Sequence, residues 1–444
     1  MATGVGYKSI GTSVTSPVDN KRRKEVLLKP PGLVGEILEL TWDSKISAAH
    51  TGVKIPAPHW RKGVPLEEDE IPQEQKFKTG SKRPGVYLVK PKNGSDDFKI
   101  KLNFSKCEVQ NSTGKIKGKL GALEFEGTCT LKKGDVVVDM KIKNLPETVA
   151  HFEGEVVWKV ENSGMLYNLG QKTRLELFVI LDTPAPFYTS GVWVEALRFV
   201  CRNAGVVGIA GVKKAPEAAR KSEAINKSEA AKKAEAIKKA EEAKKIEAAK
   251  KTETARKITA YCHGKHGVVY DTEAGASHFG ALSFGGSDFE LNNYMKKKGT
   301  NGNIVNCYDQ AAAVQSLAGS LGIKLGWYFM DPYGYINSAN LVGVGICNSP
   351  FYKYAKTGPL VDRNSRSRTY FGRHAFPGIN GKILDACAGP HLATESLREY
   401  IKSAIDAEFT VHKLFPEKTV SIYRGECEAQ PNPSGGLTGV MYYE

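Results

Sequence analysis

Alternation of apolar and polar residues is the clearest pattern in the first half of the chain. Apolar side chains occupy every second position in four runs, at residues 98–104, 136–142, 156–160 and 175–179. In a β-strand this period of two puts one face in a core and the other in water. Turn-forming residues separate the runs, for example at Lys133-Gly134 and Asn162-Ser163-Gly164. We therefore predict an all-β, sandwich-like domain over residues 84–183 with a binding or supporting role; a small barrel is the alternative.

The segments on either side of this domain have a different character. Residues 1–83 are rich in proline, glycine and charge, which indicates a flexible, irregular region with a few strands, such as 35–42. Pro184 and Pro186 mark the end of the β domain. Apolar residues then recur at helical spacing over residues 192–203. We assign residues 184–212 to a helix that belongs with the C-terminal domain.

Residues 221–256 consist of six consecutive hexapeptides that each begin Lys-x-Glu. Their alanine, glutamate and lysine favour helix, and Glu–Lys pairs recur three and four residues apart. Six residues advance about 600° around a helix of ~3.6 residues per turn, so successive repeats point about 120° apart. No continuous apolar stripe results, which disfavours a coiled coil. We predict a solvated, charged single helix over residues 213–257, about 54 Å long for its repeats, that acts as a spacer. A helix that binds a partner or a nucleic acid is the alternative.

The composition is that of a globular protein, with 41% hydrophobic and 25% charged residues over 444 positions. The formal net charge is +15, of which the repeats supply +4 through 11 basic and 7 acidic residues. No helix-turn-helix, zinc-finger or RNA-binding motif accompanies this charge, so a nucleic-acid partner is not expected.

The cysteines and the apolar runs bear on localisation. The eight cysteines are widely spaced, and we find neither a secretory signal peptide nor an apolar run of the ~20 residues that span a membrane. We expect reduced thiols and a cytoplasmic protein, or one that is exported by a signal-independent route as a toxin-like effector.

A cysteine opens a helical pattern in the C-terminal half. It follows a polar loop at residues 301–306, and the apolar residues after Cys307 recur at helical spacing until Gly322, which predicts the end of a helix. Cys307 would lie in the first turn, where N–H groups and the helix dipole favour a thiolate. The same N–H groups can stabilise the oxyanion of an acyl-transfer intermediate. Cys307 is therefore the candidate nucleophile; a buried, unreactive cysteine is the alternative.

A histidine and an aspartate further along the chain complete a catalytic set. His374 lies in a run of strand character, turn residues occupy positions 377–381, and a second strand runs from Lys382 to Asp385. A hairpin of this shape places His374 and Asp385 on neighbouring strands, close enough for a hydrogen bond. The pair would supply the base and the group that orients it.

Six further residues are candidates for contacts with substrate or oxyanion. The possible oxyanion donors are Asn301, Asn303, Asn306 and Gln310. Tyr308 and His278 are candidates for lining the cleft, and His278 is also an alternative base.

Another cluster of residues suits metal coordination. Its members are Cys262, His263, His266, Cys387 and His391. Zinc sites usually show tighter paired spacing than these residues do. We expect no metal and no cofactor.

The candidate site resembles the catalytic core of the transglutaminase-like superfamily. The residues that carry the resemblance are a cysteine at the start of a helix that ends in Gly-Ile, a strand histidine, and an aspartate after a Gly-Lys hairpin. The resemblance implies a papain-related α+β domain over residues 258–444, with Cys307 as nucleophile, His374 as base and Asp385 as the third member. The expected fold is thus multidomain: an all-β domain, a charged helix and an α+β domain.

Three details bear on this resemblance. Tyr308 fits the aromatic residue that often follows the family's cysteine. Phe376 stands where the family often has tryptophan, and the eleven positions from His374 to Asp385 are a short spacing for the family.

The expected activity is that of a thiol enzyme acting on proteins or peptides. Cys307 would attack a peptide bond or a glutamine or asparagine carboxamide and form a thioester. Hydrolysis of the thioester makes the chain a cysteine protease, amidase or deamidase, and this is the function we favour. The alternatives are a transglutaminase that crosslinks proteins through lysine, and a non-catalytic scaffold or binding protein with an inactive core.

Overall fold

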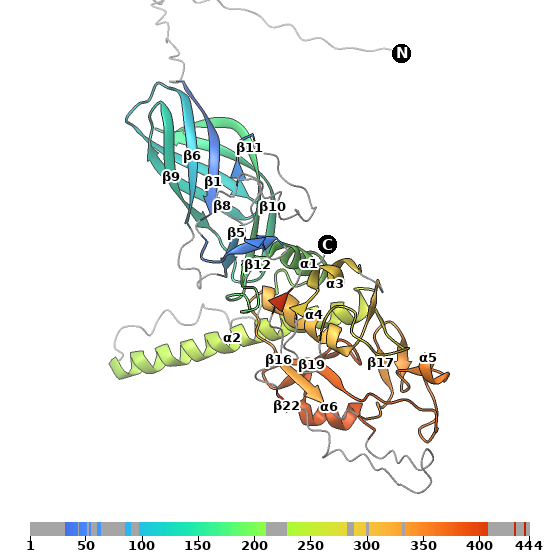
Figure 1. The fold of residues 1–444 in the computed structure, drawn as a ribbon. Coiled ribbons are helices and arrows are strands. Elements are labelled where there is room, and N and C mark those ends of the chain that lie inside the picture. The colour runs from blue at the N-terminus through green and yellow to red at the C-terminus, as the bar shows by residue number, and fades with distance from the viewer. Residues whose placement is uncertain are drawn as a thin grey trace, which may run out of the picture.

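A computed structural model of the full chain is mostly β, with a curled sheet and few helices (Figure 1). It describes residues 32–42, 44–50, 53–54, 60–63, 85–89, 97–209, 229–281, 288–298, 302–330, 334–406, 430–431 and 439–440. The candidate residue Asn301 lies outside these ranges.

Among the described residues, the N-terminal part is built around a nine-stranded sheet. Its strands, in spatial order, are β4 (Trp60–Arg61), β1 (Leu33–Trp42), β6 (Asp97–Cys107), β9 (Gly134–Lys143), β8 (Leu123–Thr130), β7 (Thr113–Leu120), β10 (Ala150–Asn162), β11 (Met165–Ile180) and β5 (Gly85–Leu88). Neighbouring strands are antiparallel except β11 and β5, which are parallel. The predicted strand at 35–42 is confirmed as β1, and it belongs to this sheet through its pairing with β6.

The predicted sandwich of two sheets is replaced by a single sheet that curls on itself (Figure 1). Register shifts in β1 and β10 mark bulges, which bend a strand and increase its twist. As a result β1 and β11, which are not hydrogen-bonded neighbours, lie against each other. Aromatic side chains fill the interior, where Phe125 stacks on Trp158 with ring centroids 5.7 Å apart. The alternation therefore predicted the buried face, whereas the bulges and the twist decided how the sheet closes.

The predicted alternation is confirmed at each of the four runs. Their apolar residues are at most 7% exposed: Phe98, Ile100, Leu102, Phe104, Val136, Val138, Met140, Ile142, Val156, Trp158, Val160, Leu175, Leu177 and Val179. Ser163 and Gly164 form the two-residue turn between β10 and β11, with φ angles of 48° and 81°. Positive φ at both positions is the geometry of a tight hairpin turn, which explains the Ser-Gly pair.

A short helix joins the curled sheet to the C-terminal part. It is α1 (Val194–Asn203), which confirms the predicted helix apart from two residues that form β12 (Val192–Trp193). β12 pairs with β2 (Ala48–His50), which pairs with β3 (Val53–Lys54). Arg198 of α1 binds the buried Glu176 of β11 through two hydrogen bonds of 3.0 and 2.7 Å. The apolar face of α1 contacts the C-terminal part, so α1 ties the two parts together.

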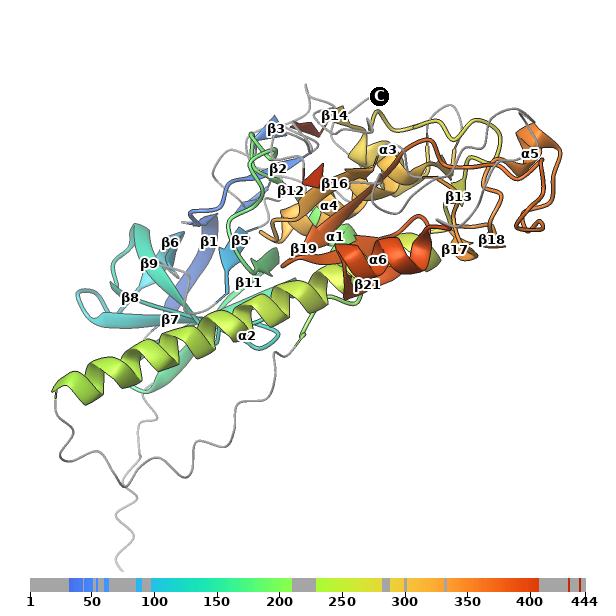
Figure 2. The same cartoon turned by 90° about the horizontal axis from the view of Figure 1, so that it is seen from below.

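The hexapeptide repeat is helical where the structure describes it, in α2 (Glu229–Gly264) (Figure 2). Residues 236–245 are exposed, as expected for a charged helix. The last turns differ from the prediction, because Ala255, Ile258 and Cys262 are fully buried. These residues are spaced three and four apart, which creates the apolar stripe that the preceding repeats lack, and this end of α2 packs against the C-terminal domain. Among the described residues, no helix is both long and apolar enough to cross a membrane.

The C-terminal part is built around a five-stranded sheet. Its order is β21 (His391–Ser396), β20 (Lys382–Asp385), β19 (His374–Ile379), β16 (Gly326–Met330) and β22 (Gln430–Pro431). Its helices are α3 (Leu291–Lys296), α4 (Cys307–Ser320), α5 (Tyr352–Ala355) and α6 (Leu397–Ala404). Shorter strands pair as β13 (Val269–Tyr270) with β15 (Ile304–Val305), β14 (Asp288–Phe289) with β23 (Gly439–Val440), and β17 (Ala339–Leu341) with β18 (Gly345–Cys347). Helix α4 packs on β19 and on α2.

Candidate active site

Cys307 is the first residue of α4, and the turn before it is firmly fixed. The side-chain oxygen of Asn306, the residue that caps the helix, accepts hydrogen bonds from the N–H groups of Tyr308 (2.9 Å) and Asp309 (3.0 Å). Asp309 in turn accepts one from the N–H of Asn306 at 3.1 Å, which completes a reciprocal capping box. Cys307 therefore enters the helix in one orientation, at the positive end of the helix dipole.

Asp309 also anchors the loop at residues 277–279, which lies next to the start of α4. Its carboxylate accepts hydrogen bonds from the Ser277 hydroxyl (2.6 Å) and from the N–H groups of His278 (2.9 Å) and Phe279 (3.2 Å). Burial raises the pKa of Asp309 to about 6, against these hydrogen bonds, which act to lower it. The carboxylate thus has a structural role beside the candidate nucleophile, where it accepts hydrogen bonds from the Ser277 hydroxyl and from backbone N–H groups.

The structure brings His374 and Asp385 together in the core. His374 Nε2 lies 2.8 Å from Asp385 Oδ2, and the two residues are 0% and 1% exposed. The predicted hairpin places them there, because β19 and β20 pair across a turn at Asn380 and Gly381 with positive φ at both positions. The imidazole is therefore held by a carboxylate that water does not reach.

Three further donors form hydrogen bonds with the Asp385 carboxylate. Oδ2 also accepts a hydrogen bond from the Tyr400 hydroxyl at 2.9 Å. Oδ1 accepts hydrogen bonds from the N–H groups of Cys387 (2.7 Å) and Ala388 (3.2 Å). Burial acts to raise the pKa of Asp385, but the positive charge of His374 and these hydrogen bonds hold it well below its usual range. Asp385 is thus a stable negative charge beside the imidazole.

His374 interacts electrostatically with Cys307 as well as with Asp385. Burial acts to lower the pKa of His374, but the charges of Asp385 and Cys307, and hydrogen bonds with both side chains, raise it to about 10. Phe371 and Phe376 flank the imidazole, with ring centroids 5.3 and 5.5 Å away. The three residues predicted as a catalytic set therefore belong to one buried electrostatic unit.

The remaining candidates from the sequence occupy several different environments. Gln310 accepts a hydrogen bond from the Tyr294 hydroxyl (2.6 Å) and donates to the carbonyl oxygens of Cys262 and Ala386. Asn306, besides capping α4, donates to the carbonyl of Gly275 at 2.9 Å. Both side-chain amides are therefore hydrogen-bonded inside the protein, where they position α4. These contacts do not favour the oxyanion role that we expected of them.

Asn303, Tyr308 and His278 lie around the start of α4. Asn303 is exposed and donates to the carbonyl of Gly267 at 3.1 Å, which joins the ends of β13 and β15. Tyr308 is partly buried against the core. His278 Nε2 lies 3.2 Å from Asp271 Oδ2, in the loop that Asp309 anchors.

Two tyrosines that the sequence analysis did not single out belong to the site. Tyr270 pairs in register with Val305, two residues before Cys307, and its ring packs edge-on against Phe371 with centroids 5.6 Å apart. Burial, followed by the charge of Cys307, raises the pKa of Tyr270 well above its ordinary value. Tyr400 reaches Asp385 from α6. Neither residue stands in a motif, so no local signal connects it to Cys307 or Asp385.

The residues considered as metal ligands have protein partners instead. His263 Nδ1 lies 3.1 Å from the carbonyl oxygen of Ala386, and His266 Nε2 lies 2.8 Å from that of Tyr294. His391 Nδ1 pairs with Glu395 at 3.1 Å. Burial raises the pKa of the Cys262 thiol to about 12, which opposes the thiolate that a metal requires.

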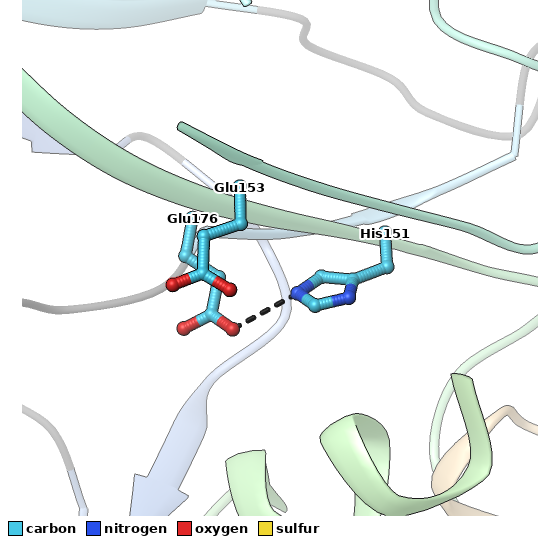
Figure 3. A group of neighbouring side chains, drawn as sticks. All are labelled: His151, Glu153 and Glu176. Carbon is cyan, nitrogen blue, oxygen red and sulfur yellow. Dashed lines mark hydrogen bonds and ion pairs between the residues drawn. The ribbon is translucent and has the colours of Figure 1, made fainter. Parts of the chain in front are cut away.

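A different group of potential ligands lies on the curled sheet. His151, Glu153 and Glu176 place their ligand atoms within 4.8 Å of one another (Figure 3). Three arginines already bind the two carboxylates: Arg198 contacts Glu176, and Arg174 and Arg202 contact Glu153 at 3.0 and 3.1 Å. These guanidinium groups neutralise the carboxylates, so the group is best described as an ion-pair network between the sheet and α1.

Comparisons with known proteins add a distant structural similarity. No protein-family model and no curated protein matches the chain. The chain is similar to the crystal structure of red sea bream transglutaminase, with 12% sequence identity and a TM-score of 0.33. The match covers 72% of this chain and 52% of that chain, so this chain spans about half the length of that transglutaminase. At this level of similarity the match supports no inference about activity.

Proposed function

We propose that the chain is a thiol enzyme that cleaves peptide or carboxamide bonds of proteins through a thioester on Cys307. The observation that carries the proposal is the buried His374–Asp385 pair, electrostatically linked to a cysteine at the first position of a helix. A buried ion pair contributes little net stability, because desolvation of both charges offsets their attraction. Such a pair beside a thiol is, in contrast, what nucleophilic catalysis requires.

The geometry suggests how the first half of the reaction would proceed. Asp385 engages His374 Nε2, so Nδ1 is the nitrogen that exchanges a proton with the Cys307 thiol. The sulfur attacks the carbonyl carbon, and the N–H groups at the start of α4 stabilise the negative oxygen. The C–N bond then breaks, and His374 gives its proton to the departing amine or ammonia. A thioester between the acyl group and Cys307 remains.

In the second half, a water molecule loses a proton to His374 and attacks the thioester. The carbonyl–sulfur bond breaks, a carboxylic acid leaves, and Cys307 recovers its proton from His374. Water needs no binding site for a second protein, so hydrolysis is the simpler course. Attack by a lysine amine instead would join two proteins by an isopeptide bond.

The function is tested by mass spectrometry of a defined mixture of purified, glutamine-rich proteins incubated with the full-length chain. Conversion of side-chain amides to acids indicates deamidation, new fragments indicate proteolysis, and loss of ammonia with joined chains indicates crosslinking. Cys307→Ala and His374→Ala should each abolish the change, because a nucleophile and its base act as a unit. A product that either variant still forms at the wild-type rate would rule out the proposed chemistry, and no product from any protein would favour the non-catalytic scaffold.

A further inference from the structure

A surface segment beside the candidate active site has its own composition and its own rigid structure. This 345–373 segment begins with β18 and ends at the residue before His374. Hydrogen bonds between the Ser349 hydroxyl and the hydroxyls of Thr357 (3.1 Å) and Thr369 (3.0 Å) hold its two arms together. Asn348 makes two more with the backbone of Val361, both 2.8 Å long. The segment therefore presents a fixed surface.

The inner side of this segment packs near both halves of the catalytic set. Phe351 lies 5.7 Å from Phe371, whose ring in turn lies 5.3 Å from that of His374. On the other side, Gly275 packs so closely on Phe351 that a side chain there would overlap the ring. The carbonyl of Gly275 accepts the hydrogen bond from Asn306, the residue before Cys307. A protein chain entering the site from this side would therefore lie along the 345–373 segment.

The outer face of the segment combines large apolar side chains with positive charge. The apolar residues are Ile346, Tyr354, Leu360 and Tyr370, which are 60%, 81%, 57% and 53% exposed. The segment contains six basic residues and one acidic residue, Asp362. Its exposed basic side chains are Lys353, Lys356, Arg363, Arg366 and Arg373, of which Lys353 pairs with Glu273 (3.8 Å) and Arg363 with Asp406 (2.9 Å).

We propose that the 345–373 segment binds an acidic stretch of the protein substrate, next to the bond that Cys307 attacks. This inference rests on the proposed function, and it names the class of substrate. Aromatic and aliphatic side chains supply contact area, and the lysine and arginine side chains select for carboxylates. Positive charge with aromatic residues also suits a single-stranded nucleic acid. We favour a protein, because the adjoining chemistry acts on an amide carbonyl.

Binding is measured by fluorescence anisotropy with the full-length chain carrying Cys307→Ala, so that nothing turns over. The probes are two labelled peptides of equal length with one central glutamine, flanked by glutamate and leucine in the first and by lysine and leucine in the second. The acidic peptide should bind about tenfold more tightly at low ionic strength, and added salt should reduce the difference.

Charge reversal locates the binding surface. Lys356→Glu with Arg366→Glu should weaken binding of the acidic peptide about tenfold. The matched control, Lys132→Glu with Lys133→Glu, changes the same charge on the β8–β9 hairpin of the curled sheet and should leave binding unchanged. Equal affinity for both peptides, equal losses in both double variants, or tighter binding of a single-stranded oligonucleotide would each overturn the inference.

This test can fail separately from the catalytic proposal, because binding is measured without turnover. If Cys307→Ala binds the acidic peptide selectively but the wild-type chain shows no activity, the docking surface stands and the proposed enzymatic function is refuted. Activity without charge selectivity would do the reverse.

Discussion

Replacing Asp385 by asparagine removes the charge that holds His374 while keeping the size of the side chain. The wild-type carboxylate accepts four hydrogen bonds, from His374 and Tyr400 on one oxygen and from the N–H groups of Cys387 and Ala388 on the other. An amide offers one oxygen only. With its NH2 group on the Oδ1 side, the amide faces two backbone N–H groups and two hydrogen bonds are lost. With the NH2 group on the Oδ2 side, it can only donate to Tyr400 and His374, which must then act as acceptors. In either orientation the imidazole loses its counter-charge.

Removing one partner of a buried ion pair typically costs about 3–5 kcal/mol of unfolding free energy, which is the loss we expect for Asp385→Asn. The loss should depend on pH. The folded-state pKa of Asp385 is lowered and that of His374 is raised to about 10, so the pair stabilises most between about pH 4 and pH 6.5. Its contribution falls below that range, because Asp385 of the unfolded chain takes up a proton while the folded carboxylate stays charged. It also falls as pH rises from about 6.5 towards 10, because the histidine of the unfolded chain is then neutral.

Tyr400→Phe is the matched control, since it removes one donor to the same carboxylate without changing any charge. It should cost about 1 kcal/mol, with no comparable dependence on pH. Urea unfolding followed by tryptophan fluorescence at several pH values measures both variants. Turnover should fall about 10³–10⁴-fold in Asp385→Asn, less than in His374→Ala, because the imidazole is misoriented and not absent. Equal unfolding free energies for Asp385→Asn and Tyr400→Phe across this pH range would refute the buried ion pair.

Two further predictions concern the cysteines and α2. Cys307 should react with iodoacetamide before Cys129 and Cys201, although these two are more exposed. The reason is that burial raises the pKa of the Cys129 and Cys201 thiols to about 11 and about 12. Peptide mapping after brief labelling measures the order of reaction, and equal rates would exclude an activated thiol at Cys307. In α2, Ala255→Pro should lower the melting temperature by about 6–12 °C, whereas Ala236→Pro should break the exposed turns, at about 3 kcal/mol, without shifting the main transition. Similar melting temperatures for the two variants would contradict the packing of the C-terminal end of α2.

Local sequence patterns were sufficient for much of the framework. The alternation at residues 98–104 predicted a buried strand face, because side chains of a strand point to opposite faces whatever the strand pairs with. The start of α4 at Cys307 and its end near Gly322 followed from a polar loop, helical spacing and a glycine. In the structure this glycine has a φ of 77°. The His374–Asp385 contact also followed from local sequence, since both residues lie on one hairpin.

Contacts between distant segments were decided by the tertiary structure. Tyr270 lies beside Cys307 through the pairing of β13 with β15, and Tyr400 reaches Asp385 because α6 packs on the sheet. From sequence, Asn306 and Gln310 are both possible oxyanion donors. Their side chains instead bind the carbonyl oxygens of Gly275 and Cys262, and these bonds depend on what α4 packs against. The burial of Ile258 likewise depends on the C-terminal domain lying alongside the end of α2. A sequence determines periodicity, caps and turns because these involve residues a few positions apart; register, curl and helix packing join residues far apart in the chain, and they follow from the way whole apolar surfaces fit together.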